Sequence, residues 1–194
     1  MGAVVLASQG ASTSAFITAV VASDSPRLIR AGLEPLLGLG ELLGGQAHVV
    51  PYTARLPTDH LHPNTGQMPA TTTNGLLTET TPGAARALVT AASGPGAAMA
   101  QMRSVGGAVN DTDPSATAYT HRHQRTLVIA TTFPPGGRRA LEAAWKGVAP
   151  HTDGAYVNFE SNPDEAAYPG ATGDRVTALR ERYDPDRVLR PWAG

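Results

Sequence analysis

The residues best suited to binding a ligand lie in the stretch GAYVNF, residues 154–159. Small or polar residues alternate with large ones there, so a strand would turn Tyr156 and Asn158 to one face and Val157 and Phe159 to the other. A half-buried strand that turns its aromatic ring and amide toward a cavity could form the wall of a ligand site. The commoner interpretation of the same pattern is an ordinary strand with one solvated side, and both stay open on these residues alone.

Two His-x-His pairs, His60/His62 and His121/His123, have the spacing that places two imidazoles on one face of a strand. Neither pair has a third ligand at a set spacing, and arginines flank the second pair. We therefore expect structural or surface histidines and no metal site. The chain also has no cysteine and no G-x-S-x-G motif, which leaves a hydrolase nucleophile unsupported.

The glycine pairs at 106–107 and 136–137 match neither G-x-G-x-x-G nor G-x-x-x-x-G-K-[ST], so no phosphate-binding loop is expected. The segment Asp184-Pro185-Asp186 lacks the ligand spacing of a calcium loop. Because proline disfavours helical geometry at the residue before it, this segment predicts the end of a helix near Tyr183.

Length and charge limit the function classes. With 194 residues the chain predicts a single domain over residues 1–194. A net charge of −1 gives no electrostatic reason to expect nucleic acid as a partner. No apolar run approaches the roughly 20 residues of a membrane span, and the first residues lack a basic segment before the apolar run. We expect a soluble, cytoplasmic protein without a membrane partner.

The elements that must position these residues alternate between strand and helix patterns. In the first half we expect a hairpin of Ala3–Ala7 with Ala15–Ala22, and then a helix that is capped by Asp24 or Ser25 and ends at Gly38. An edge or bulged strand is expected over Ala47–Thr53. The stretch Arg55–Asn74 predicts a long surface excursion or, equally, a disordered segment. In the second half we expect a helix opened by Thr81-Pro82, strands at Met99–Val105 and within Thr117–Thr132, a helix after Gly137, the GAYVNF strand and a helix over 172–182. The mixture lacks regular βαβ alternation and predicts an α+β fold, with a largely antiparallel sheet backed by helices on one face.

Three segments in order carry a family resemblance: QMRSVGGA (101–108) with ATAYTHR (116–122), then GAYVNF, then RYDPDRV (182–188). This ordered set resembles the C-terminal half of berberine bridge enzyme-like FAD-linked oxidases, of the vanillyl-alcohol oxidase type superfamily. In that family a glycine pair, an ATA-aromatic-x-HR run, a YxN strand and a terminal YDPxN segment follow one another. The likeness spans essentially the whole chain, with the family's C-terminal motif at about 154–191.

The resemblance implies a substrate (cap) domain whose antiparallel sheet forms a roof over the isoalloxazine ring of FAD. It implies that Tyr156 and Asn158 face the flavin and orient it. It places Gln101 and Arg103 on a neighbouring strand that faces the substrate, and allows Tyr119 on the same side. Arg122 is expected to make an ion pair or carbonyl contacts.

The chain departs from the family pattern at several positions. Many relatives have a tyrosine that serves as catalytic base where this chain has Phe159, which has no proton to exchange. Some carry an acidic residue where it has Arg103. In the terminal motif Arg187 replaces the asparagine and Leu189 the aromatic residue. The catalytic residue is therefore left unassigned.

The family's flavin-binding half, with its pyrophosphate loop, is not in this sequence. We therefore expect negligible affinity for FAD from this polypeptide alone. The favoured hypothesis is the substrate-binding portion of an FAD-dependent oxidoreductase that oxidises a small organic molecule, either truncated or acting with a separately encoded FAD-binding domain. The alternative is a non-catalytic small-molecule binding module or a degenerate remnant without flavin.

Overall fold

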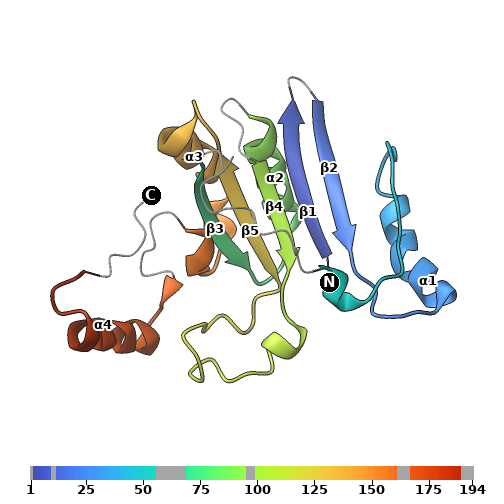
Figure 1. Cartoon of the computed structure of the whole chain (residues 1–194). Coiled ribbons are helices and arrows are strands. Elements are labelled where there is room, and N and C mark those ends of the chain that lie inside the picture. Colours follow the sequence, from blue (N-terminus) through green and yellow to red (C-terminus); the bar gives the residue numbers. More distant parts are fainter. Residues whose placement is uncertain (1, 10–11, 56–68, 95–98, 161–166, 189–194) are drawn as a thin grey trace. The chain divides into compact units, whose positions relative to one another are not determined.

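The computed structural model describes residues 2–9, 12–55, 69–94, 99–160 and 167–188 (Figure 1). The chain divides into two compact units: one extends from Ala19 to Met68, and the other comprises Gly2–Thr18 and Pro69–Gly194. The larger unit holds the sheet and every candidate site residue. The single domain expected over residues 1–194 stays a prediction.

The larger unit is built on a five-stranded sheet with the order β2-β1-β4-β5-β3. The strands are β1 (Gly2–Gln9), β2 (Ser12–Ala19), β3 (Thr71–Leu77), β4 (Met99–Ser104) and β5 (Thr126–Thr132). The pairings of β1 with β4, β4 with β5 and β5 with β3 are antiparallel. The predicted α+β fold with a largely antiparallel sheet is confirmed.

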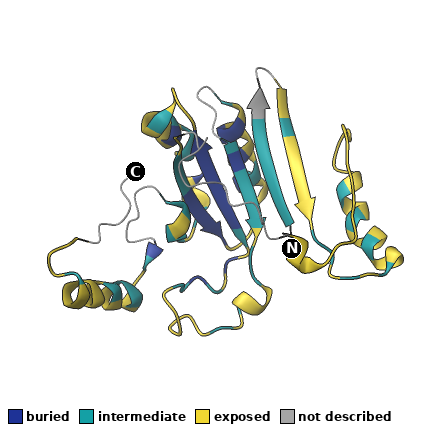
Figure 2. Ribbon diagram, viewed as in Figure 1, coloured by how far each residue is buried: buried dark blue, intermediate teal, exposed yellow. Residues whose placement is uncertain are grey.

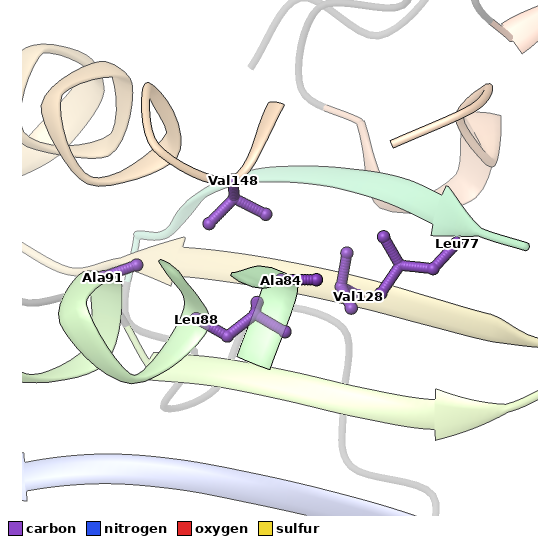
Figure 3. Close-up of a cluster of buried hydrophobic side chains, with 6 residues drawn as sticks. All are labelled: Leu77, Ala84, Leu88, Ala91, Val128 and Val148. Carbon is purple, nitrogen blue, oxygen red and sulfur yellow. The ribbon is translucent and has the colours of Figure 1, made fainter. Parts of the chain in front are cut away.

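Two helices pack on one face of this sheet, α2 (Pro82–Ser93) and α3 (Gly137–Trp145). The Thr81 hydroxyl accepts a hydrogen bond from the Ala84 N–H and so caps α2, with Pro82 in the first turn. Figure 3 shows the apolar cluster that joins helices and sheet: Leu77, Ala84, Leu88, Ala91, Val128 and Val148. Burial of this cluster holds α2 and the segment after α3 against the central strands.

Alternation along β5 separates the two faces of the sheet. Val128 and Ala130 contribute to the clusters on the helix side, whereas Leu127 and Ile129 join Leu76 in a second cluster on the opposite face. Figure 2 shows β5 and most of β3 buried, because both strands are covered on two sides, and β2 exposed at the sheet edge. The face opposite α2 and α3, which we call the open face, carries the candidate site.

The remaining elements are short or peripheral. The larger unit contains the 3-10 turns η2 (Gly107–Val109), η3 (Ala149–His151) and η4 (Val157–Phe159), and the helix α4 (Ala171–Tyr183). The smaller unit contains α1 (Pro26–Leu37), flanked by Ser25 and Gly38, and the 3-10 turn η1 (Tyr52–Arg55). In the described part of the chain, no helix combines the length and apolar character that a membrane crossing needs.

Most expected elements are confirmed, including the end of α4 at Tyr183 before Asp184-Pro185. The strand expected over Ala47–Thr53 is wrong: residues 47–51 are irregular and the chain then enters η1. Pro51 has no N–H to donate to a strand ladder, which explains the failure. The surface excursion expected up to Asn74 is wrong at its end, where β3 begins at Thr71. His60, His62 and Leu189 lie outside the described residues.

Candidate functional site

Tyr156 is fixed to the open face by the side chain of Asn74, a buried residue of β3. The Tyr156 N–H donates to Asn74 Oδ1 at 2.7 Å, and Asn74 Nδ2 donates to the Tyr156 carbonyl at 2.9 Å. One amide side chain thus satisfies both backbone groups of Tyr156, as a neighbouring strand would. The position of the tyrosine is therefore set from the sheet itself.

The strand expected over GAYVNF is wrong, and the Asn74 contact explains why. Pairing with β3 begins at Leu76, which accepts from the Asp153 N–H at 2.7 Å and donates to the Gly154 carbonyl at 3.0 Å. At Tyr156 the Asn74 side chain takes the place of the strand backbone, and η4 follows. As a result Tyr156 and Phe159 both pack on Leu76, Leu127 and Ile129, rather than on opposite faces. Asn158 is exposed.

Tyr156 and Asn158 form a hydrogen-bonded pair: Asn158 Nδ2 donates to the phenol oxygen of Tyr156 at 2.7 Å. Because the phenol oxygen is the acceptor in this contact, its own O–H remains available to donate. The Asn158 carbonyl oxygen likewise remains available to accept. The pair therefore offers a ligand one donor and one acceptor at neighbouring positions.

Two further rings surround Tyr156. Tyr119 meets it edge to face, with centroids 5.7 Å apart and an interplanar angle of 89°, and Phe159 lies 5.7 Å away at 58°. Both distances are in the range of favourable aromatic pairs. Tyr119 lies in the loop of residues 110–125 between η2 and β5, which we call the 119 loop, and Tyr156 and Phe159 lie at the start and end of η4. The three rings form one aromatic cluster on the open face.

Arg122 holds Tyr119 in this cluster. Its guanidinium carbon lies 5.0 Å from the centre of the Tyr119 ring, while its nitrogens donate to the Val109 carbonyl at 2.9 Å and to Thr117 Oγ1 at 2.7 Å. The carbonyl contacts expected for Arg122 are confirmed. Burial raises the pKa of Tyr119, with a smaller contribution of the same sign from Tyr156, and the Arg122 cation opposes the change. The Tyr119 phenol is therefore protonated at neutral pH, and its O–H is a potential hydrogen-bond donor to a ligand.

Gln101 and Arg103 reach the open face from β4. Arg103 donates to Gln101 Oε1 at 3.1 Å, and its guanidinium carbon lies 4.9 Å from the centre of the Phe159 ring. Their cross-strand partners on β5 are Ile129 and Leu127, the two residues on which the aromatic cluster packs. The contact of Arg103 with Phe159 therefore connects Gln101 and Arg103 to the aromatic cluster.

His121 packs against Tyr119 and Gly154 beneath the aromatic cluster. It is buried, its ring meets Tyr119 at 5.6 Å and 74°, and it lies against Gly154, whose φ is +89°. Burial lowers the pKa of His121 below its ordinary value of 6.5, while the backbone of Ala155 and Ala167 and the Asp153 charge oppose the shift and His123 adds to it. His121 is thus a neutral packing residue at pH 7.

His123 has a different environment from its neighbour. It contacts Asp153 at 2.9 Å in an exposed pair, whereas His121 is buried. No group of three potential ligands occurs among the described residues. The expected structural and surface roles of this histidine pair therefore agree with their positions.

The structure brings together all five residues proposed from the sequence: Tyr156, Asn158, Gln101, Arg103 and Tyr119 are linked through Phe159 and the contacts above. Sequence reasoning missed Asn74. Residues up to Asn74 were expected to form a surface excursion, because the stretch is rich in Pro, Thr, His and Asn and lacks periodicity. The β-branched threonines before Asn74 and the leucines after it were the available signal for a strand.

Solved structures share this fold. The chain aligns with aclacinomycin oxidoreductase over 97% of its length, at 18% identity and a TM-score of 0.69, covering 45% of that protein. It aligns over 61% with a glycopeptide hexose oxidase complexed with teicoplanin, at 21% identity and a TM-score of 0.52, covering 30% of that chain. It aligns over 62% with BBE-like 1 of Physcomitrella patens, at 19% identity and a TM-score of 0.54, covering 29% of that chain.

Each alignment therefore spans less than half of the neighbour's length. The fold that the sequence resemblance implied is confirmed. No protein-family model matches the sequence, and no curated protein matches it.

Proposed function

We propose that this chain is the substrate-binding part of an FAD-dependent oxidoreductase of the berberine bridge enzyme-like family. The observation that carries the proposal is the hydrogen-bonded pair of Tyr156 and Asn158, set on an aromatic cluster beside Gln101 and Arg103. Residues that are remote in the sequence converge on one sheet face. The ordered sequence motifs and the fold shared with aclacinomycin oxidoreductase support the assignment.

The residues present fit the polar edge of an isoalloxazine ring. That edge alternates carbonyl and ring-nitrogen acceptors with an N–H donor, and the Tyr156 hydroxyl and the Asn158 amide supply both kinds of partner. Asn74 holds the backbone of Tyr156, and the Tyr119 and Phe159 rings and the Asn158 amide hold its side chain, so the phenol is already positioned for a ligand. In this proposal Tyr156 and Asn158 orient the flavin, and Gln101, Arg103 and Tyr119 contact the substrate.

Bound FAD would supply the acceptor for a hydride from a substrate C–H bond. The role of this chain is to bind and orient the substrate and to exclude water from one side of the ring. Phe159 occupies the position of the catalytic base in many relatives and packs on Arg103 instead. A proton acceptor, where the reaction needs one, must come from another residue.

The diphosphate and adenosine parts of FAD would be held by a separate flavin-binding domain, which is the partner we propose. Mixing the chain with an FAD-loaded domain of this family at micromolar concentration should yield a complex that elutes together and absorbs at about 450 nm. Failure to associate would count against a two-part enzyme.

A second candidate is a non-catalytic module that binds a small aromatic molecule without flavin. The phenylalanine at the position of the family's base favours it, because Phe159 cannot exchange a proton. Such a module should be folded and monodisperse alone and stabilised by its ligand. Because a substrate-binding domain can also bind an aromatic molecule, association with the FAD-loaded domain separates the two candidates: the two-part enzyme predicts a complex, and the module predicts none.

A further inference from the structure

Gln101 and Arg103 together present only hydrogen-bond donors to the open face. The guanidinium has no acceptor atom, so the Gln101 oxygen must face Arg103 in their 3.1 Å contact. The amide NH₂ of Gln101 is then directed away from Arg103. A ligand beside this pair meets the remaining guanidinium N–H groups and the two amide N–H groups, and must itself supply acceptors.

The Arg103 cation lacks an acidic partner in the part of the chain that the structure describes. The ion pair recorded there joins His123 and Asp153. Arg103 is only partly exposed, and its guanidinium rests on the Phe159 ring, with Leu127 beside it across the strand pair. The guanidinium–ring contact is favourable in itself but leaves the charge without a counterion among the described residues, so an anionic ligand beside it would gain charge-assisted hydrogen bonds.

Glu160, the acidic residue that directly follows Phe159, contacts β3. The carboxylate of Glu160 accepts a hydrogen bond of 2.7 Å from Thr73 Oγ1 on β3. Strand β5 lies between β3 and β4 in the sheet. The Glu160 carboxylate is thus bound to the β3 side of the open face, and no ion pair between Glu160 and Arg103 is recorded among the described residues.

We propose that Gln101 and Arg103 bind a carboxylate group of the substrate, so that the substrate is an aromatic or apolar carboxylic acid. A planar carboxylate matches the guanidinium fork, and the Gln101 amide adds a further donor. The Phe159 ring lies against Arg103, and the Tyr156 ring lies against Phe159, so the adjoining surface fits an aromatic body. The inference rests on the proposed function, because it assigns a substrate class to the same site.

The test uses the full chain and two probes of equal shape, benzoate and benzamide. We expect benzoate to shift the Arg103 Nε–Hε resonance in a ¹⁵N correlation spectrum in a saturable way, and benzamide to bind at least about ten-fold more weakly, since only benzoate is charged. Equal binding of the two probes would overturn the proposal. So would equal binding of inorganic phosphate at matched ionic strength, because the site would then select charge rather than a carboxylate.

Two variants and a control keep the test independent of folding. Arg103→Met removes the cation and should abolish benzoate binding. Gln101→Glu keeps the arginine but supplies it with an internal carboxylate, and should weaken benzoate binding about ten-fold or more. Arg86→Met, at an exposed position of α2 on the other face of the sheet, should bind as the wild type does. Undiminished binding by Gln101→Glu, if that protein is folded, would contradict the assignment.

A last experiment decides whether the hydrogen-bond acceptors that bind Gln101 and Arg103 belong to a substrate carboxylate or to the flavin. Benzoate is titrated into the chain in complex with an FAD-loaded flavin-binding domain. Retained binding supports a substrate carboxylate, and lost binding would show that the flavin edge occupies Arg103 instead. Because the first titrations need no flavin domain, a failure of the proposed function leaves their outcome readable.

Discussion

Asn158 and Tyr156 are joined by a 2.7 Å hydrogen bond from the amide to the phenol oxygen, two residues apart in a turn that was expected to be a strand. Asn74 holds the same tyrosine by its backbone. The anchoring of Tyr156 and its presentation to a ligand are thus divided between two asparagines. We therefore expect a substitution of Asn74 to lower the stability of the fold, and a substitution of Asn158 to have little effect on it.

Replacement of Asn74 by alanine should destabilise the fold. It leaves the N–H of Tyr156 without its partner next to the sheet, while the Tyr156 carbonyl keeps only the Phe159 N–H at 3.1 Å. The cost should be about 1–3 kcal/mol in the free energy of unfolding. Asn158→Ala removes an exposed hydrogen bond and should cost about 0.5 kcal/mol. Urea unfolding measures both. Similar losses for the two variants would show that Asn74 is not the anchor.

Replacement of Tyr156 by phenylalanine should affect association more than stability. The variant keeps the ring and its contacts with Tyr119 and Phe159 but loses the hydroxyl that accepts from Asn158. We expect an unfolding midpoint close to that of the wild type. Affinity for an FAD-loaded flavin-binding domain should fall about ten-fold, a loss of about 1.4 kcal/mol. Isothermal titration calorimetry measures it, and unchanged affinity would remove Tyr156 from the flavin contact.

Gly154 is expected to tolerate no side chain. It has φ +89°, and a Cβ there would collide with the His121 ring. Gly154→Ala should cost about 3 kcal/mol, part from the backbone conformation and part from the collision. In a His121→Ala background the further cost of Gly154→Ala should fall to about 1 kcal/mol, because the collision is gone.

Gly147→Ala is the matched control, since a Cβ at Gly147 meets no atom within 4 Å and its φ is not in the left-handed region. It should leave the unfolding midpoint nearly unchanged. An undiminished cost of Gly154→Ala in the His121→Ala background would contradict the packing described for these two residues.

The lowered pKa of His121 predicts a pH-dependent stability. The folded state binds the proton less well than the unfolded chain, whose ordinary pKa is 6.5. Between the folded pKa and 6.5 the unfolded state therefore holds more protons, and stability falls as the pH decreases through this window. Above the unfolded pKa the full stability contribution is present. Urea unfolding at a series of pH values should show this slope.

Two histidine variants assign the slope to its source. His121→Gln should flatten it, whereas His123→Gln, which alters an exposed histidine, should retain most of it. Equal slopes in the wild type and His121→Gln would show that another group titrates in this window.

The sequence predicted the fold best where the pattern is local. The Thr81-Pro82 start of α2 and the Asp184-Pro185 end of α4 were identified because capping and proline geometry act within a few residues. The five site residues were found through motif order. Their contacts with one another could not be derived, because they depend on how β4, the 119 loop and η4 pack in space.

The local structure of GAYVNF could not be predicted for a related reason. Its period-two pattern is compatible with a strand, but the hydrogen bonds of Tyr156 are taken by a side chain 82 residues away. Likewise the composition of residues 55–74 gave no sign that Asn74 holds the backbone of Tyr156. Long-range side-chain to backbone contacts leave no periodic signal in the sequence.

The most direct test of the proposed function follows the Asn158 side-chain amide by ¹⁵N NMR while the chain is titrated with a flavin-binding domain of the berberine bridge enzyme-like family. We predict a large shift of this resonance with the FAD-loaded domain, a much smaller one with the flavin-free domain, and loss of the difference in Tyr156→Phe. Identical shifts with loaded and flavin-free domain, or no shift at all, would contradict the claim that this sheet face contacts the flavin.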